Sequence, residues 1–526
     1  MASTTTQYSQ ANRQMSLSTP LGTDVLLLQN LTYREELGRP FEMILEMQST
    51  NAEIDFNQIL GQSVTVTIQM PQGSSGESSP RYLNGIVRKF TQTVFQSADG
   101  LSSYRAEVVP WISMLELTSN CQAYQNQTIP QIIAAVFESF NFGDYTLNLT
   151  QDYSTRPFCV QYRESAFNFV HRLLEFAGIY YYFVHSDGSH QIMFCDSLAN
   201  YVPFPGFSEI AYDSHQNMVE GQINDWSLDA SLCTGSVVLN DYDYTAPKTN
   251  LMGTSTTSQP YAQGAYEYFD FPGYYDSQDN YNRFAQRLLL EKQCNQTTGR
   301  GSGPLLCVSA GYQFTLAGFP RQDQSRSYLT TSATLTITSP PYSSGERVDN
   351  DDKTVYRTEF TAIPASVVFV PRRITQKPVV QGIETAVVVG PSGQSTNLPY
   401  TNEYGCVTVQ FLWDRYGLAN QNSSIPIRVS HISAGNGWGS MFIPRIGNEV
   451  IVSFVSGDPD RPIATGCLYN AVSMPGVTLP ANSTLSYISD DGGNFINFTP
   501  TQGGQSVMIY CPYNNTHRVL GNNPNS

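Results

Sequence analysis

Residues 402–470 read NEYGCVTVQFLWDRYGLANQNSSIPIRVSHISAGNGWGSMFIPRIGNEVIVSFVSGDPDRPIATGCLYN. Short apolar, β-branched runs alternate here with tight turns, and residues 406–411 show the period of two that is typical of a half-buried strand. The turn at 457–462 combines a permissive glycine with two φ-fixing prolines and two turn-forming aspartates. Five short strands joined by such turns predict a small Greek-key barrel of the OB type over residues 402–472.

The composition of the whole 526-residue chain limits its class of function. The 44 acidic and 28 basic side chains leave a net charge of −16, and no cluster of Lys and Arg is present to replace the counterions of a phosphate backbone. The sequence therefore predicts no nucleic-acid partner, and an anionic membrane surface is disfavoured for the same reason. Tyr, Asn, Gln, Ser and Thr are plentiful, which suits strands, turns and extended protein contacts.

Cysteine usage and the first residues concern the compartment. Nine cysteines are scattered from Cys121 to Cys511 with no close pair, which favours thiols in a reducing cytoplasm over a disulfide framework or a zinc site. Residues 1–6 contain neither the basic nor the apolar region of a Sec signal. If the protein leaves the cell, we expect it to do so without Sec.

Strand patterns dominate the rest of the chain, so the predicted class is mainly β with minor α. Helices are predicted from Thr128 with Pro130 in the first turn, from Ser165 to Gly178, and over 282–292. Residues 390–401 and a second stretch near 474–482 break the pattern and predict linkers. They divide the chain into a large N-terminal part (1–389), the OB domain and a short tail (473–526).

Three segments of the quoted stretch resemble, in order, hallmark segments of the VgrG family, the type VI secretion spikes related to phage tail hub and spike proteins. The segments are 403–415, 434–450 and 457–470. The motif residues that carry the resemblance, and to which we assign a structural role, are Trp413, Asp414, Arg415, Pro444, Arg445, Gly447, Glu449, Gly457, Asp458, Pro459, Asp460, Arg461 and Pro462. Cys406 and Thr408 stand where relatives have Arg and Lys, which puts in doubt any salt bridge made there. The resemblance implies that this OB domain joins a hub to a needle.

The resemblance continues through the N-terminal part, for example at 36–41, 162–183 and 311–314. It implies a phage-hub-like region over 1–389, with a barrel at about 15–115, an α/β insertion at about 120–205 and a second barrel at about 206–389. The segment 385–391 is expected to end this region. In a trimer, such barrels would make a pseudo-sixfold ring that stacks on the Hcp tube hexamer.

The tail is expected to begin a trimeric β-helix needle. Apolar residues alternate over 495–498 and 507–511, and 503–504 supplies a turn. Isolated strands of this kind cannot bury their apolar faces or satisfy their edges alone, whereas three chains wound together can. The residues expected to make the trimer are Phe495, Ile496, Phe498, Val507 and Ile509. The needle is expected to be short, either as a natural stub or as a truncation.

Patterns typical of enzymes and metal sites are weak. His185, Asp187 and His190 lie close in sequence, but Asp187-Gly188 favours a hairpin turn over a metal site. His171 and Glu175 share one helix face without the HExxH pattern, so a surface or core pair is favoured. The acidic runs 349–352 and 490–491 are expected in solvated loops, and Asp414 with Arg415 could form a local ion pair. No catalytic residue, metal or cofactor is predicted.

The expected function is a non-enzymatic, homotrimeric spike. Its implied partners are the Hcp tube, a PAAR-type tip protein, baseplate components, and effectors with their adaptors. We expect it to be made in the bacterial cytoplasm, assembled at the inner-membrane baseplate and expelled into a target cell or the medium. Two alternatives stay open: a hub of a phage tail or extracellular contractile particle, and a glycan-binding or glycan-cleaving β protein.

Overall fold

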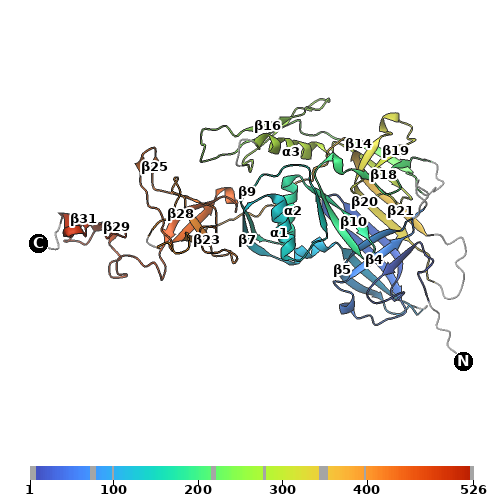
Figure 1. Ribbon diagram of the computed structural model, residues 1–526, viewed down its shortest axis with the longest axis horizontal. Coiled ribbons are helices and arrows are strands. Elements are labelled where there is room, and N and C mark those ends of the chain that lie inside the picture. The colour runs from blue at the N-terminus through green and yellow to red at the C-terminus, as the bar shows by residue number, and fades with distance from the viewer. Residues whose placement is uncertain are drawn as a thin grey trace. The chain divides into compact units, whose positions relative to one another are not determined.

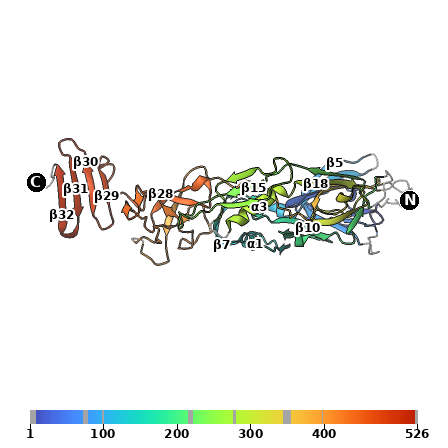
Figure 2. The same cartoon turned by 90° about the horizontal axis from the view of Figure 1, so that it is seen from above.

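The computed structural model describes residues 8–71, 79–97, 100–214, 221–275, 280–342, 354–395 and 398–521. The chain divides into two compact units (Figures 1 and 2). Unit 1 comprises Met1–Ser119, Thr128–Thr155 and Ser165–Lys377, and unit 2 comprises Asn120–Gln127, Arg156–Glu164 and Pro378–Ser526. The predicted mainly β class is confirmed, and the acidic run at 349–352 lies outside the described residues.

A 13-stranded sheet forms the body of unit 1, with β1-β4-β5-β6-β3-β2-β20-β21-β18-β14 as its main path and β12, β13 and β19 branching from β20. Its strands are β1 (Met15–Ser18), β2 (Leu27–Glu36), β3 (Arg39–Ser49), β4 (Ser63–Ile68), β5 (Arg81–Val94), β6 (Ser102–Val109), β12 (Val202–Pro203), β13 (Glu209–Ala211), β14 (Asp225–Ala230), β18 (Thr297–Gly303), β19 (Tyr312–Ala317), β20 (Ser327–Thr338) and β21 (Val355–Pro364). Alternate burial along β3 shows that one face supplies the core and the other meets solvent. Antiparallel pairing of β2 with β20 joins the N-terminal strands to those from the second half of unit 1.

The three predicted helices are confirmed as α1 (Ile129–Ser139), α2 (Ala166–Ala177) and α3 (Tyr281–Gln293). Thr128 and Gln131 form a reciprocal capping box that satisfies the first turn of α1. Ser165 caps α2, and Gly178 ends it in the left-handed conformation at φ 72°. No helix among the described residues is both long and apolar enough to cross a membrane.

The described residues of unit 1 also form two smaller sheets. The hairpin of β10 (Tyr180–Ser186) and β11 (Ser189–Cys195) turns at Asp187-Gly188 as predicted, and β8 (Tyr145–Asn148) runs parallel to β11. The strands β15 (Ser236–Leu239), β16 (Gly253–Thr256) and β17 (Glu267–Asp270) form a separate sheet. Short 3-10 turns in the two units are η1 (Phe56–Gln58), η2 (Trp111–Leu117), η3 (Leu198–Asn200), η4 (Gln322–Gln324), η5 (Val455–Gly457) and η6 (Tyr513–Asn515).

Unit 2 contains a five-stranded sheet in the order β23-β22-β27-β28-β24. Its strands are β22 (Glu384–Val389), β23 (Thr408–Phe411), β24 (Arg428–Val429), β27 (Glu449–Phe454) and β28 (Pro462–Leu468), and a small hairpin of β25 (Ala434–Gly435) and β26 (Trp438–Gly439) lies beside them in sequence. The strand β22 corrects the sequence-based assignment, which placed 385–391 at the end of the hub region. Ala386 and Val388 on β22 are fully buried with Val409 and Val450, so the OB core is incomplete without this strand.

A second correction concerns the predicted insertion at 120–205. The ribbon of β7 (Asn120–Gln127) and β9 (Arg156–Glu164) belongs to unit 2, because Phe158, Val160 and Tyr162 are buried in the same cluster as the OB strands. The segments between and after the two strands return to unit 1. The other predicted domain boundaries stay predictions.

The tail forms a four-stranded antiparallel meander, visible in Figure 2 as strands side by side. Its strands are β29 (Ser486–Ser489), β30 (Phe495–Thr499), β31 (Ser506–Cys511) and β32 (Thr516–Gly521). The predicted strands at 495–498 and 507–511 are therefore present, paired within a single chain.

Candidate functional site

The turn at 457–462 holds the β7–β9 ribbon in unit 2. The buried carboxylate of Asp460 accepts the backbone N–H of Val160 at 2.7 Å and lies 3.6 Å from the guanidinium of Arg156. Asp458 accepts the N–H of Asp460 at 2.9 Å and lies 4.0 Å from Arg461. One aspartate therefore shapes the turn, while the other binds a strand three hundred residues upstream.

Glycines of the motif let the backbone approach β22 and the segment before it. The carbonyl of Gly457, at φ +73°, accepts the N–H of Val380 at 2.8 Å. An added Cβ on Gly457 would lie 2.6 Å from Cγ1 of Val379. Gly447, at φ +90°, donates its N–H to the carbonyl of Val388 at 2.8 Å. Only glycine adopts such a conformation without strain.

The prolines of the motif stiffen the same loops. Pro444, Pro459 and Pro462 are all buried, and Pro462 opens β28. Their rings fix φ where the chain turns between strands.

Arg445 ties the OB loop to the turn between β29 and β30. Its guanidinium makes a bidentate ion pair with Asp491, at 2.7 and 2.6 Å. Its backbone N–H donates to Asn448 at 2.7 Å, and Glu449 accepts from Asn470 at 2.9 Å. Sequence analysis predicted only a solvated loop around Asp491, because a partner 46 positions away leaves no local pattern.

Trp413 covers the edge of the OB core. Its ring stacks on Phe411 at a centroid distance of 4.8 Å and meets Tyr162 edge-on at 6.0 Å. Asp414 accepts the backbone N–H of Tyr416 at 3.0 Å, and Arg415 donates to the Tyr416 hydroxyl at 2.7 Å. The two charged side chains thus shape the turn after β23 through Tyr416.

The tail sheet has two different faces, which its register defines. Ile488, Ile496 and Ile509 lie in one cross-strand row, and Phe498 pairs with Val507 in the next row of the same face. We call this the aliphatic face; its apolar members are Ile488, Ile496, Phe498, Val507, Ile509 and Leu520, and Arg518 pairs with Ile509 on the same face. Of these, Ile488, Phe498, Ile509 and Leu520 are about half exposed. Large apolar patches left open in this way mark interaction surfaces.

Phe495 points to the other face, where it stacks on Tyr510 with 4.8 Å between ring centroids. Of the five residues predicted to make the trimer, four therefore share the aliphatic face and Phe495 does not. The period of two predicts that neighbours differ in face, but the cross-strand register is needed to say which face is continuous.

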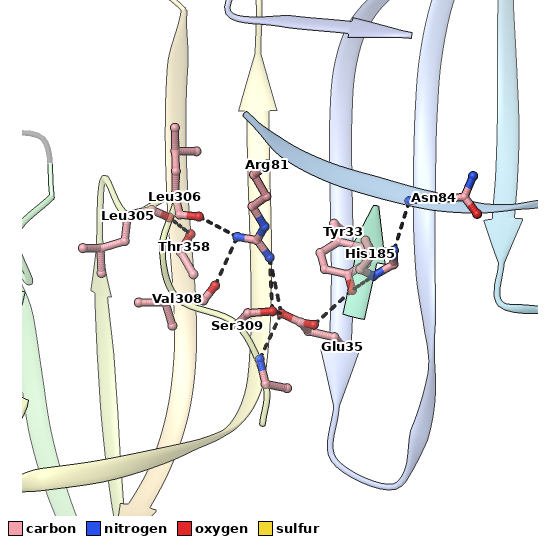
Figure 3. Close-up of polar contacts among 11 residues, drawn as sticks. Tyr33, Glu35, Arg81, Asn84, His185, Leu305, Leu306, Val308, Ser309 and Thr358 are labelled. Atoms are coloured by element: carbon pink, nitrogen blue, oxygen red, sulfur yellow. Dashed lines mark hydrogen bonds and ion pairs between the residues drawn. The ribbon is translucent and has the colours of Figure 1, made fainter. Parts of the chain in front are cut away.

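In unit 1, a buried polar joint connects three segments that are distant in sequence (Figure 3). Glu35 on β2 accepts hydrogen bonds from the Ser309 hydroxyl at 2.7 Å, the Ala310 N–H at 3.0 Å and the Tyr33 hydroxyl at 3.0 Å. Arg81 on β5 lies 3.7 Å from Glu35. We call Tyr33, Glu35, Arg81 and Ser309 the hub joint.

Arg81 also holds the segment between β18 and β19 directly. It donates to the carbonyls of Leu306 at 2.6 Å and Val308 at 3.3 Å, and to the Ser309 hydroxyl at 3.2 Å (Figure 3). Burial raises the pKa of Glu35, and the Arg81 guanidinium opposes that shift. Buried charges persist only where they are paired and hydrogen-bonded in this way.

The two histidines of the β10–β11 hairpin extend the hub joint. His185 contacts the Tyr33 hydroxyl at 3.0 Å and accepts the backbone N–H of Asn84 at 3.0 Å (Figure 3). His190 accepts the N–H of Trp111 at 3.0 Å and contacts Oδ1 of Asn84 at 2.8 Å. Across the described residues, no group of His, Cys, Asp and Glu is arranged to hold a metal ion.

His171 and Glu175 are both buried, and each bonds elsewhere. His171 contacts the Phe167 carbonyl at 2.9 Å and the Tyr181 hydroxyl at 2.8 Å. Glu175 pairs with Arg39 at 2.8 Å and accepts from backbone N–H groups at 374–375. The prediction of a core or surface role over HExxH chemistry agrees with these contacts. Sequence reasoning missed the hub joint, whose only signal is four polar residues inside apolar strands and turns.

Two protein-family models match the chain. Residues 34–341 match "Phage tail baseplate hub (GPD)", and residues 403–469 match "Type VI secretion system/phage-baseplate injector OB domain". The first match covers more than half of the chain, and the second coincides with the stretch quoted at the start.

Curated relatives are similar over much greater lengths. The type VI secretion system spike protein VgrG1a of Pseudomonas aeruginosa is 37% identical over 520 residues, which is 97% of this chain and 79% of the relative. VgrG1c of the same organism is 37% identical over 517 residues, 96% of this chain and 69% of the relative. The actin cross-linking toxin VgrG1 of Vibrio cholerae is 33% identical over 443 residues, 82% of this chain but only 39% of the toxin.

Solved structures share the fold. The E. coli c3393 protein, a component of the type VI secretion system, superposes with a TM-score of 0.59 at 19% identity, covering 86% of this chain and all of that one. A chain of the Francisella PdpA–VgrG complex superposes with a TM-score of 0.64 at 10% identity, covering 97% of this chain and 78% of that one. The motifs, the fold and the sequence identity over nearly the whole chain agree, and the chain belongs to the VgrG family of type VI secretion system spike proteins.

Proposed function

We propose that three copies of this chain form the spike of a contractile secretion machine, held together at the tail by their aliphatic faces. One observation carries the proposal: in a single chain this face of the β29–β32 sheet is open. Three such sheets around a common axis would cover one another and leave the opposite faces outward. The family membership is consistent with such a spike.

The free energy available from this burial is substantial. Fully burying an Ile, Leu or Phe side chain stabilises by roughly 1.5–3 kcal/mol, so closing a half-exposed one contributes about 1 kcal/mol. Five of the side chains on the aliphatic face are 37–55% exposed. They would contribute about 5 kcal/mol per chain, or about 15 kcal/mol per trimer, before the entropy of association is subtracted.

The proposal includes the partners and the delivery role that membership of the VgrG family implies. The hub end docks on the Hcp tube, the needle end carries a PAAR-type tip, and effectors with their adaptors ride on the assembly. The protein acts mechanically, without catalysis: it is made in the cytoplasm, joins the baseplate and is expelled into a target. The toxin of Vibrio cholerae is an actin cross-linking protein by name, but this chain covers 39% of it, and that activity is not part of the proposal.

A hub of a phage tail or extracellular contractile particle is the second candidate. The description "Phage tail baseplate hub" for residues 34–341 favours it specifically. Genes for an Hcp tube and sheath beside this one would support the secretion system, whereas capsid or tail-fibre genes would support the particle. Because the chain belongs to the VgrG family, the alternative of a glycan-binding or glycan-cleaving protein is no longer favoured.

The test is the mass of the purified chain in solution, measured by light scattering at several concentrations. We expect three chains for the wild type. Val507→Asp should lower the mass toward one chain, because it places a carboxylate between Phe498 and Leu520 inside the trimer. Met508→Asp is the matched control, since it adds the same charge one residue away on the opposite face. A monomeric wild type, or equal effects of both substitutions, would refute the arrangement.

A further inference from the structure

His185 and His190, on the β10–β11 hairpin, form hydrogen bonds that depend on the protonation state of their rings. Each imidazole accepts a hydrogen bond from a backbone N–H: Asn84 donates to Nδ1 of His185, and Trp111 donates to Nε2 of His190, both at 3.0 Å. A nitrogen that accepts must be unprotonated, so both rings are neutral in this arrangement. Their remaining N–H groups then donate to the Tyr33 hydroxyl and to Oδ1 of Asn84.

The hydrogen bonds between the rings and the hub joint all have the same direction of donation. His185 donates to Tyr33, and Tyr33 donates to Glu35, which Arg81 and Ser309 also hold. The same Asn84 that binds both histidines fixes the neighbouring strand, through donation to the Val64 carbonyl at 3.2 Å and the Thr65 hydroxyl at 2.8 Å. Losing the neutral rings would therefore disturb β4, β5 and η2 together.

Protonation is incompatible with these contacts. A second ring proton would place N–H against N–H at 3.0 Å for Asn84 and for Trp111. The two ring centroids are 6.1 Å apart, so two imidazolium groups would also repel each other.

The groups around the rings do not favour a positive charge. Arg81 from β5 adds a third cation, and Glu35, the carboxylate of the hub joint, is already bound to Arg81. Tyr33 from β2 is a neutral phenol whose pKa burial raises well above its ordinary value. Phe41 packs against both rings, at 5.0 and 5.6 Å between centroids, and its face could attract one cation but cannot replace a lost backbone hydrogen bond.

We propose that His185 and His190 are an acid-sensitive latch of the hub: neutral, they clamp β5 and η2 to the β10–β11 hairpin, and protonated, they release them. In an acidic compartment the hub would loosen at this point while the OB sheet stays closed. Burial lowers the pKa of His190 to about 4 and that of His185 well below its usual range, whereas a released ring titrates at about 6.5, so acid favours release already at pH 4.5.

His171 provides a matched comparison within the same unit. It is also buried, and burial lowers its pKa to about 4. Its Nδ1 donates to the Phe167 carbonyl, however, and its Nε2 meets a hydroxyl that can rotate. A proton can be added there without opposing a backbone N–H, so His171 lacks the latch geometry.

Hydrogen–deuterium exchange of the full chain at pH 7.5 and pH 4.5, corrected for intrinsic exchange, tests the latch. We expect peptides covering Asn84 and Trp111 to lose at least tenfold in protection at pH 4.5, while peptides from β27 keep theirs. The variant His185→Asn His190→Gln places non-titrating amide oxygens where the two accepting nitrogens lie, and its protection should be independent of pH. His171→Gln should show the same acid loss of protection at Asn84 and Trp111 as the wild type.

Unchanged protection of the wild type at Asn84 and Trp111 would overturn the proposal, as would the same acid loss in the double variant. Should the double variant not fold, the wild-type comparison between these peptides and β27 decides alone.

Discussion

Replacing Arg81 by methionine tests how the hub joint is held. Arg81 and Glu35 are 5% and 4% exposed, and Arg81 makes three further hydrogen bonds to the segment between β18 and β19. Removing one partner of a buried pair costs about 3–5 kcal/mol, because the other charge is left without compensation. At about 2 °C per kcal/mol for a large domain, the thermal midpoint of the hub should fall by about 6–10 °C.

A second, exposed ion pair in the same unit is the control. Arg300 and Asp229 are closer, at 2.8 Å against 3.7 Å, but their side chains are 66% and 57% exposed. Water screens such a pair, so Arg300→Met should cost less than about 1 kcal/mol. If distance decided the contribution, the order of the two variants would be reversed.

The double variant Arg81→Met Glu35→Gln completes the cycle. Gln keeps polar atoms for Ser309, Ala310 and Tyr33 but carries no charge, so it should recover part of the loss caused by Arg81→Met alone. Scanning calorimetry of the wild type, Arg81→Met, Glu35→Gln and the double variant measures the coupling free energy between the two residues, which we expect to exceed about 1 kcal/mol. Additive effects, or an Arg81→Met midpoint within about 2 °C of wild type, would refute the account of a charge-paired joint.

Three further outcomes are expected. Asp460→Asn should lower stability by about 1–3 kcal/mol and raise proteolysis of the β7–β9 ribbon, because a charged acceptor for Val160 becomes a weaker neutral one; an unchanged cleavage rate would contradict this. Gly457→Ala should cost more than about 1 kcal/mol in the same unfolding assay, since it combines φ +73° with a 2.6 Å contact. The folded pKa of about 4 for His190 lies below its unfolded value of about 6.5, so stability should fall as the pH drops from 6.5 to 4, with about 3 kcal/mol of the loss from His190 alone; a flat profile of thermal midpoint against pH in that range would exclude it.

Much of this protein could be predicted from local sequence. Two helices were predicted correctly, one from Thr128 with Pro130 in its first turn and one from Ser165 to Gly178, because each signal acts within four residues of the backbone it satisfies. The hairpin at Asp187-Gly188 and the strands flanking the 457–462 turn were predicted for the same reason. The resemblance of the 403–470 segments to VgrG proteins predicted the family.

Only the tertiary structure decided which distant segments meet. The strand β22 joins the OB sheet, Asp460 binds a strand near residue 160, and Arg81 finds Glu35, because burial in a shared core selects these partners and sequence spacing does not encode it. Likewise, alternation placed Phe495 and Ile496 on opposite faces, but only the pairing register across β29–β32 showed which face is continuous and aliphatic. Short-range signals determine elements and turns, whereas hydrogen bonds and packing between segments far apart in sequence determine which surfaces the fold leaves open.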